Sequence, residues 1–285
     1  MLEVHSDEKL TPVRVCYGTK SEQFGDLYLP KILKRQCSLH PVMILIHGGY
    51  WKDNHDLNSY ATSQLIPELV VLGWAVWNIE YRRMDSLGAN IKAPWPSVFT
   101  DVSCAVDAIR LFAEEYSLDT KNVSVIGHSA GGCLALWAAS RQKIPVTSPL
   151  FNTKPLLIRR AMSICGVLSL THPEDLCQPE QIMRLMGGTA VDWPERYSAC
   201  DPAQLYDPAV SILLIHGDRD KTVKVHQAFR YIENGPNSIQ LEVWSDTDHF
   251  SMLPHDGEWS SYDWSYLKAR IRDFFNMTHW NEVNS

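Results

Sequence analysis

Short apolar runs alternate along the chain with longer stretches in which apolar residues recur at helical spacing. The runs are continuously apolar, which is typical of strands that are covered on both faces. They predict six strands, at residues 41–47, 74–81, 122–127, 160–166, 211–216 and 239–244. Residues 24–30 are expected to add an antiparallel strand at an edge of the sheet.

Helical periodicity lies between these strands. It predicts helices at residues 57–72, 98–116, 130–141, 226–233 and 263–275. Strands that alternate with helices favour an α/β fold, with a mostly parallel central sheet and helices on both faces. No internal repeat or low-complexity linker divides the sequence, so residues 1–285 are expected to form a single domain.

The least regular stretch, residues 168–208, lies between two predicted strands and is longer than a simple connection needs. We expect it to form a small lid or a pocket wall. A purely structural helical excursion is the alternative.

Composition excludes several functional classes. With 45% hydrophobic residues, 21% charged residues and ten tryptophans, the chain is typical of a globular protein. Its net charge is −7 and it has no run of Lys and Arg, so we expect no nucleic-acid partner. The N-terminus lacks a basic stretch before an apolar one, and no segment approaches 18 uncharged apolar residues, so we expect a cytoplasmic protein without a membrane partner. A homodimer is left open.

The seven cysteines are odd in number and show neither a Cys-x-x-Cys pair nor zinc-like spacing. They are Cys16, Cys37, Cys104, Cys133, Cys165, Cys177 and Cys200. We expect free, buried thiols and no metal site. Cys133 is interpreted as a packing residue, with a reactive thiol as the alternative.

The first chemical signal is Gly127-His128-Ser129-Ala130-Gly131, which follows a predicted strand and precedes a predicted helix. This is the context of a nucleophile elbow, in which flanking glycines permit a crowded turn and the serine hydroxyl is exposed above the sheet. Ser129 is therefore the candidate nucleophile. The amide of Ala130, directly after it, is expected to donate to an oxyanion.

The second signal is the sequence His-Gly-Gly-Tyr-Trp at residues 47–51, at the end of an earlier strand. Glycine-rich backbone at such a point can direct amide groups at a developing oxyanion. We expect the turn at Gly49 and Tyr50 to supply the second half of an oxyanion hole. A simple tight turn after a strand is the alternative.

A serine nucleophile needs a base, and it needs an acid that orients the base. In proteins with this type of elbow the chain order is Ser, then Asp or Glu, then His. His249 is late in the chain and follows a predicted strand, so it is the predicted base, with His255 as second choice. Asp220 is the predicted acid because it lies farther into its loop than Asp218, which we expect to stabilise the turn.

Together these motifs resemble the α/β-hydrolase superfamily, and within it the branch of kynurenine formamidase (arylformamidase) and related small carboxylesterases. The resemblance is carried by residues 47–51, 127–131 and Asp-His-Phe at 248–250, with weaker similarity at residues 80–83, 95–96, 101–102 and 105–107. The sequence Gly-Gly-Cys-Leu at 131–134 departs from the Gly-Ala-His-Leu of animal kynurenine formamidases.

The resemblance implies a serine hydrolase that cleaves an ester or amide of a small molecule without a cofactor. An arylformamidase acting on N-formylkynurenine is the finer hypothesis, and a general carboxylesterase is the alternative. A prolyl-oligopeptidase-like peptidase is weaker, because too little chain precedes residue 41 for a gating domain. A non-catalytic binding protein is disfavoured, because all three triad positions are filled.

Aromatic residues accompany the motif loops. Tyr50, Trp51 and Phe250 are predicted to line the mouth of a substrate pocket, and Trp95 is a weaker candidate. Packing in the core is the alternative for each of them.

Overall fold

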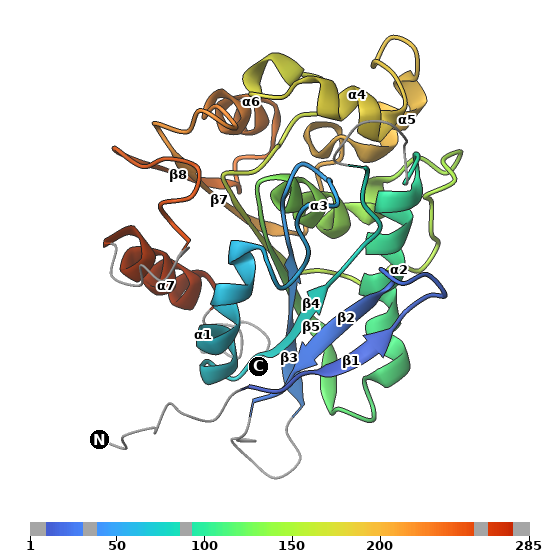
Figure 1. The fold of residues 1–285 in the computed structure, drawn as a ribbon, viewed down its shortest axis with the longest axis vertical. Helices are drawn as coiled ribbons and strands as arrows, with labels where there is room; N and C mark the ends of the chain where they lie inside the picture. Colours follow the sequence, from blue (N-terminus) through green and yellow to red (C-terminus); the bar gives the residue numbers. More distant parts are fainter. Residues whose placement is uncertain (1–9, 31–38, 86–92, 254–261, 276–285) are drawn as a thin grey trace.

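The computed structural model describes residues 10–30, 39–85, 93–253 and 262–275. In this part of the chain the central element is an eight-stranded sheet with the order β1-β2-β4-β3-β5-β6-β7-β8 (Figure 1). The strands are β1 (Val13–Cys16), β2 (Phe24–Tyr28), β3 (His40–Ile46), β4 (Ala75–Ile79), β5 (Leu118–His128), β6 (Arg160–Ile164), β7 (Ser211–Gly217) and β8 (Gln240–Trp244). Within this sheet only β2 runs opposite to the other strands, so the sheet is mostly parallel, as predicted.

The position of β2 differs from the prediction. Residues 24–28 form the expected antiparallel strand, but β1 lies outside it and makes the true edge of the sheet. β1 has no apolar run because most of its side chains are exposed. Its pairing is strengthened by a polar contact that periodicity does not reveal, in which Arg14 Nε donates to Asp26 Oδ1 at 2.8 Å.

The predicted helices are present, with two additions in residues 168–208. The α-helices are α1 (Ile66–Val71), α2 (Ser97–Phe112), α3 (Ala130–Ala139), α4 (Glu180–Met186), α5 (Pro194–Cys200), α6 (His226–Asn234) and α7 (Tyr262–Phe275). Short 3-10 turns are η1 (Ala61–Leu65), η2 (Arg141–Lys143), η3 (Pro173–Asp175) and η4 (Pro202–Gln204). Among the described residues, no helix is both long and apolar enough to span a bilayer.

The helix predicted at 57–72 begins later, as η1 followed by α1. Asp56 explains the delay, because its carboxylate accepts hydrogen bonds from the backbone amides of Asn58 and Ser59. Such side-chain-to-backbone bonds offer the chain a turn in place of a helix.

Helices cover both faces of the sheet and create two cores. Along β3, Val42 and Ile44 face the core beneath α2 and α3. Met43 and Leu45 face the opposite core, beneath α1 and α7. Figure 1 shows these two pairs of helices on opposite sides of the strands. The continuous apolar runs in the sequence therefore reflect burial on both faces.

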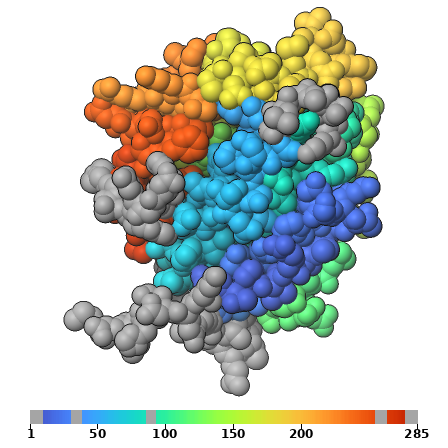
Figure 2. All heavy atoms as spheres, viewed as in Figure 1, coloured from blue at the N-terminus to red at the C-terminus, as the bar shows by residue number. Residues whose placement is uncertain are grey.

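The irregular stretch at residues 168–208 contains η3, α4, α5 and η4, and Figure 2 shows it, mostly in yellow, at one end of the molecule. Gln227, which is buried on α6, holds the first residues of this stretch by hydrogen bonds. Its Oε1 accepts from the amides of Leu168 and Ser169, and its Nε2 donates to the carbonyl of His172. These contacts hold the beginning of the stretch against α6, and its role as a lid or a pocket wall stays a prediction.

Candidate active site

The turn between β5 and α3 places Ser129 at the carboxyl edge of the sheet. Ser129 has φ +57° and ψ −123°, a strained conformation for a residue with a side chain. A Cβ atom on Gly127 would lie 2.1 Å from the carbonyl oxygen of Gly131, and one on Gly131 would lie 2.2 Å from that of Ile46. Both flanking glycines are therefore required by close backbone packing.

Backbone hydrogen bonds hold this strained turn. The Ser129 amide donates to the carbonyl of Ile164 at 2.9 Å, and the Ser129 carbonyl accepts from the amide of Val167 at 3.1 Å. Ala130 is the first residue of α3, so its amide has no acceptor within the helix. The positive end of the helix dipole lies at the same point, which makes the Ala130 amide suited to an oxyanion.

The second predicted half of the oxyanion hole, the turn after β3, packs directly on the elbow. Gly49 and Tyr50 adopt φ values of +99° and +51°. A Cβ atom on Gly48 would lie 2.7 Å from the carbonyl oxygen of His128. The structure thus brings together the two motif segments, which are about 80 residues apart in the sequence.

A buried polar cluster supports this turn. Glu80, just after β4, lies 3.0 Å from His47 Nε2 and accepts a hydrogen bond from the amide of Leu57. Burial alone would raise the pKa of Glu80, but the hydrogen bond and charge of His47 and the charge of Arg83 outweigh it and lower that pKa. The ionised carboxylate therefore holds the His47 ring before the turn and the Leu57 backbone after it. Sequence analysis did not assign Glu80 this role.

Asp220 and His249 meet at the same edge of the sheet, after β7 and β8. Asp220 Oδ2 lies 2.6 Å from His249 Nδ1, while Asp220 Oδ1 accepts hydrogen bonds from the amides of Thr222 and Val223 at 2.8 Å each. Asp220 is buried and Asp218 is exposed. The loop-ordering role that we expected of Asp218 thus belongs to Asp220 itself.

The protonation of Asp220 follows from these contacts. Burial would raise its pKa, but hydrogen bonds from His216, His249 and the Val223 amide lower it well below the ordinary aspartate value. The carboxylate therefore stays ionised and can orient the imidazole of His249.

His249 also lies beside the elbow. Its ring centroid is 4.7 Å from that of His128, and its carbonyl oxygen lies 2.7 Å from His128 Nε2. Because Nδ1 of His249 faces Asp220, its Nε2 is left to act as a base. His255, the second choice for this role, lies outside the described residues.

The three predicted pocket aromatics differ in exposure. Phe250 is 40% exposed and packs edge-on against His249, so it is available at the surface of the site. Tyr50 is buried and its hydroxyl donates to the carbonyl of Thr222 at 2.9 Å. Trp51 is fully buried in the core beneath α2 and α3, which fits the packing alternative, and its contact with substrate stays a prediction.

We expect Tyr50→Phe to lower kcat/KM about fivefold to tenfold, the effect of losing roughly one hydrogen bond. The Tyr50 hydroxyl ties the proposed oxyanion turn to Thr222, whose amide binds Asp220. Steady-state hydrolysis of a p-nitrophenyl ester measures the change. Tyr206→Phe is the control, because that hydroxyl bonds to the Tyr231 carbonyl instead. An unchanged kcat/KM for Tyr50→Phe would show that the tie does not matter.

Two overlapping groups of side chains have the spacing of metal ligands: His128 with Cys165 and His249, and Cys165 with His216 and Asp220. Hydrogen bonds already engage most of the imidazole and carboxylate atoms in these groups. His128 bonds through both ring nitrogens, His216 Nε2 faces the carbonyl of Val223, and His249 Nδ1 faces Asp220. The arrangement fits a hydrogen-bonded centre better than a metal centre.

The described cysteines are less uniformly buried than expected, and Cys37 lies outside the described residues. Cys16, Cys104 and Cys177 are exposed, whereas Cys133, Cys165 and Cys200 are buried. Cys133 packs in the core, and burial raises the pKa of its thiol well above the ordinary value. This thiol is therefore unreactive, which agrees with a packing role.

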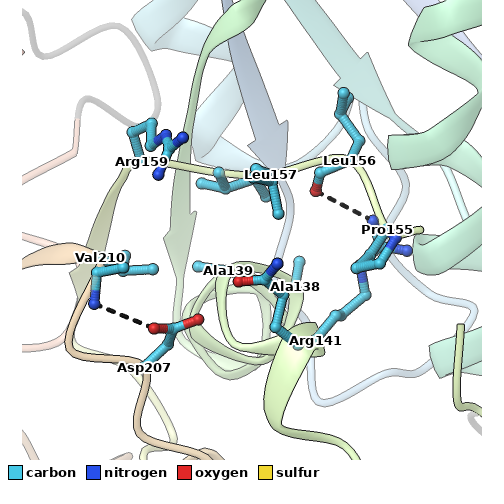
Figure 3. A pocket seen from close by; sticks show the side chains of 12 residues that line it. Ala138, Ala139, Arg141, Pro155, Leu156, Leu157, Arg159, Asp207 and Val210 are labelled. Carbon is cyan, nitrogen blue, oxygen red and sulfur yellow. Dashed lines mark hydrogen bonds between the residues drawn. The ribbon is translucent and has the colours of Figure 1, made fainter. Parts of the chain in front are cut away.

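Figure 3 shows a small pocket whose lining includes Ala138, Ala139 and Arg141, at the end of α3 and just beyond it. Arg141 and Asp207 line it at the carboxyl end of α3, and its volume is about 10 Å³, room for about one water molecule. Because a ten-residue helix spans about 15 Å, this pocket lies at the far end of α3 from the elbow. It is not part of the candidate active site.

Comparisons with known proteins agree with this architecture. The model of the BD-FAE family matches residues 25–233. Esterase LipQ of Mycobacterium tuberculosis (strain ATCC 25618 / H37Rv) is 27% identical over 192 residues, which are 66% of this chain and 44% of LipQ. Esterase LipC of the same organism is 26% identical over 234 residues, 77% of this chain and 54% of LipC. The chain thus spans about half the length of these curated relatives.

Solved structures confirm the predicted α/β-hydrolase fold. A truncated form of a carbohydrate esterase from gut microbiota superimposes with a TM-score of 0.71 at 21% identity, covering 92% of this chain and 95% of that one. The propionate-bound esterase Est2 of the Planctomycetes species Thermogutta terrifontis gives a TM-score of 0.70 at 18% identity, with coverage of 92% and 93%. At these identities the likeness establishes the fold.

Proposed function

The chain belongs to the BD-FAE family, and on that premise we propose that it is a serine hydrolase that cleaves carboxylic esters of small molecules. The observation that carries the proposal is the 2.6 Å contact between Asp220 Oδ2 and His249 Nδ1, at the sheet edge that also holds the strained elbow of Ser129. The esterases LipQ and LipC support the choice of substrate bond.

In the proposed reaction Ser129 Oγ attacks the carbonyl carbon of the ester while His249 Nε2 accepts the hydroxyl proton. The amides of Ala130 and of the turn at Gly49 and Tyr50 stabilise the oxyanion that forms. The intermediate collapses, His249 returns the proton to the leaving alcohol, and the acyl group stays on Ser129. Water, deprotonated by His249, then releases the carboxylic acid.

The comparisons favour the general carboxylesterase, which sequence analysis kept as an alternative, over the arylformamidase that it placed first. The arylformamidase hypothesis rests on the resemblance carried by residues 47–51, 127–131 and 248–250. A formamide also presents a carbonyl to the same nucleophile, so the two hypotheses share one mechanism. They differ in the pocket that receives the substrate.

The discriminating experiment compares kcat/KM for p-nitrophenyl acetate, p-nitrophenyl butyrate and N-formyl-L-kynurenine on the full chain. We expect the esters to exceed the formamide by at least tenfold, a difference of about 1.4 kcal/mol in transition-state binding. A higher value for N-formyl-L-kynurenine would replace the proposal with an arylformamidase. No turnover of any of the three, and no labelling by a fluorophosphonate, would contradict the serine hydrolase.

A further inference from the structure

Tyr60, which precedes η1, reaches the nucleophile elbow although no motif contains it. The side chain is 5% exposed, and its hydroxyl oxygen lies 2.8 Å from Nδ1 of His128, the neighbour of Ser129. A Cβ atom on Gly48 would lie 2.4 Å from the same hydroxyl oxygen. The hydroxyl therefore lies between the elbow and the turn that follows β3.

The direction of this hydrogen bond follows from the other ring nitrogen of His128. Nε2 lies 2.7 Å from the carbonyl oxygen of His249, which can only accept, so Nε2 carries a hydrogen. Burial and the neighbouring His249 lower the pKa of His128 to about 3, so the ring is neutral and Nδ1 has a free lone pair. Tyr60 consequently donates its hydroxyl proton to His128.

With its one proton committed, the Tyr60 hydroxyl fixes one ring nitrogen of His128, while the carbonyl of His249 fixes the other. The hydroxyl is thereby joined through one imidazole to the loop that carries His249. Because His128 directly precedes Ser129, the same imidazole also joins this loop to the nucleophile elbow.

We propose that Tyr60 is a positioning residue for the hydrolysis, whose hydroxyl fixes the His128 ring and, through it, the loop that places His249 beside the elbow of Ser129. This inference rests on the proposed function.

The test is Tyr60→Phe, which removes the hydroxyl and keeps the ring. We expect kcat for a p-nitrophenyl ester to fall about tenfold to hundredfold while KM changes less than about threefold, because the hydroxyl orients reacting groups and does not bind the substrate. A boronic acid that mimics the tetrahedral intermediate should bind more weakly by the same factor as kcat/KM. Labelling of Ser129 by a fluorophosphonate should slow in parallel.

Tyr231→Phe is the matched control. Tyr231 is fully buried on α6, and its hydroxyl has no hydrogen-bond partner among the described residues. This variant should keep the kcat of the natural protein. A second variant, His128→Gln, should lower kcat, and the double variant Tyr60→Phe/His128→Gln should lose little more than the worse single variant, since the two side chains act as one unit.

Three results would overturn the inference: a kcat for Tyr60→Phe within twofold of the natural protein, a rise in KM with kcat unchanged, or an equal loss of kcat in Tyr231→Phe. Ser129→Ala separates this inference from the proposed function. If Ser129→Ala is inactive and Tyr60→Phe is normal, only the role of Tyr60 fails. If Ser129→Ala remains active, the proposed hydrolase mechanism fails first.

Discussion

Ser129→Ala is expected to lower kcat by about 10⁴-fold to 10⁶-fold, the loss found when a serine nucleophile is removed from a triad. The Asp220–His249 pair remains in this variant but has no hydroxyl to deprotonate. The oxyanion donors are backbone amides and are retained, so weak residual turnover by water is expected.

The fold should survive this substitution. Alanine keeps the Cβ atom of serine, so the strain at φ +57° is neither added nor removed. The hydrogen bonds that hold the turn are made by the Ser129 backbone, with Ile164 and Val167 as partners. The midpoint of thermal unfolding should therefore lie within a few degrees of that of the natural protein.

Ser124→Ala is the matched control, because Ser124 is a buried serine on β5 whose hydroxyl has no partner among the described residues. It should keep both activity and stability. Retention of more than about 1% of kcat in Ser129→Ala, with the enzyme purified free of other esterases, would contradict the proposed nucleophile.

The sheet and the elbow could be predicted because their signals are local. Helices on both faces force every side chain of β3 into a core, and this leaves a continuous apolar run in the sequence. The glycines at 127 and 131 are required because an added Cβ atom would lie 2.1 and 2.2 Å from backbone oxygens, so the motif itself indicates the close packing of the elbow. Local patterns of this kind can be recognised in the sequence without knowing which distant residues are in contact.

The edge strand β1 lacked such a signal. Its side chains are largely exposed, and its contact between Arg14 and Asp26 joins residues on separate strands. The same holds for residues 168–208, whose beginning depends on Gln227 from α6. Pairings of this type depend on the three-dimensional register and not on the local sequence.

The supporting residues of the site were hidden for the same reason. Tyr60 and His128 are 68 positions apart, and His47 and Glu80 are 33 apart. A tyrosine or a glutamate in an otherwise ordinary stretch has no pattern that marks it as part of a site. By contrast, Asp220 could be favoured over Asp218 because loop position alone decides which carboxylate can turn towards a histidine after the next strand.

Asp220→Asn is expected to lower kcat about 10³-fold to 10⁴-fold, as when the acid of a triad becomes an amide. In one orientation the new amide presents its NH₂ group to His249 Nδ1, which forces the hydrogen of the imidazole onto Nε2 and removes the base. In the other orientation the NH₂ group faces the amides of Thr222 and Val223, which are donors themselves. The first orientation keeps its hydrogen bonds but selects the wrong tautomer of His249, and the second sets donors against donors.

Asp218→Asn is the matched control, two positions away and exposed, and it should change kcat less than threefold. Steady-state kinetics on one p-nitrophenyl ester compares the two variants. The opposite ranking would show that Asp218 is the catalytic acid and that the contact between Asp220 and His249 is structural.

Asp220→Asn should also differ from the natural protein in how its stability depends on pH. The pKa of Asp220 is lowered in the folded protein, so its carboxylate contributes stability above the unfolded value of about 4, and this contribution is lost as the pH falls through the folded value. The natural protein should therefore exceed Asp220→Asn in unfolding midpoint at pH 7, and the gap should narrow in acid. A gap that stays constant from pH 7 to pH 3 would mean that the charge of Asp220 does not hold the loop, leaving its hydrogen bonds to Thr222 and Val223 as the sole structural role.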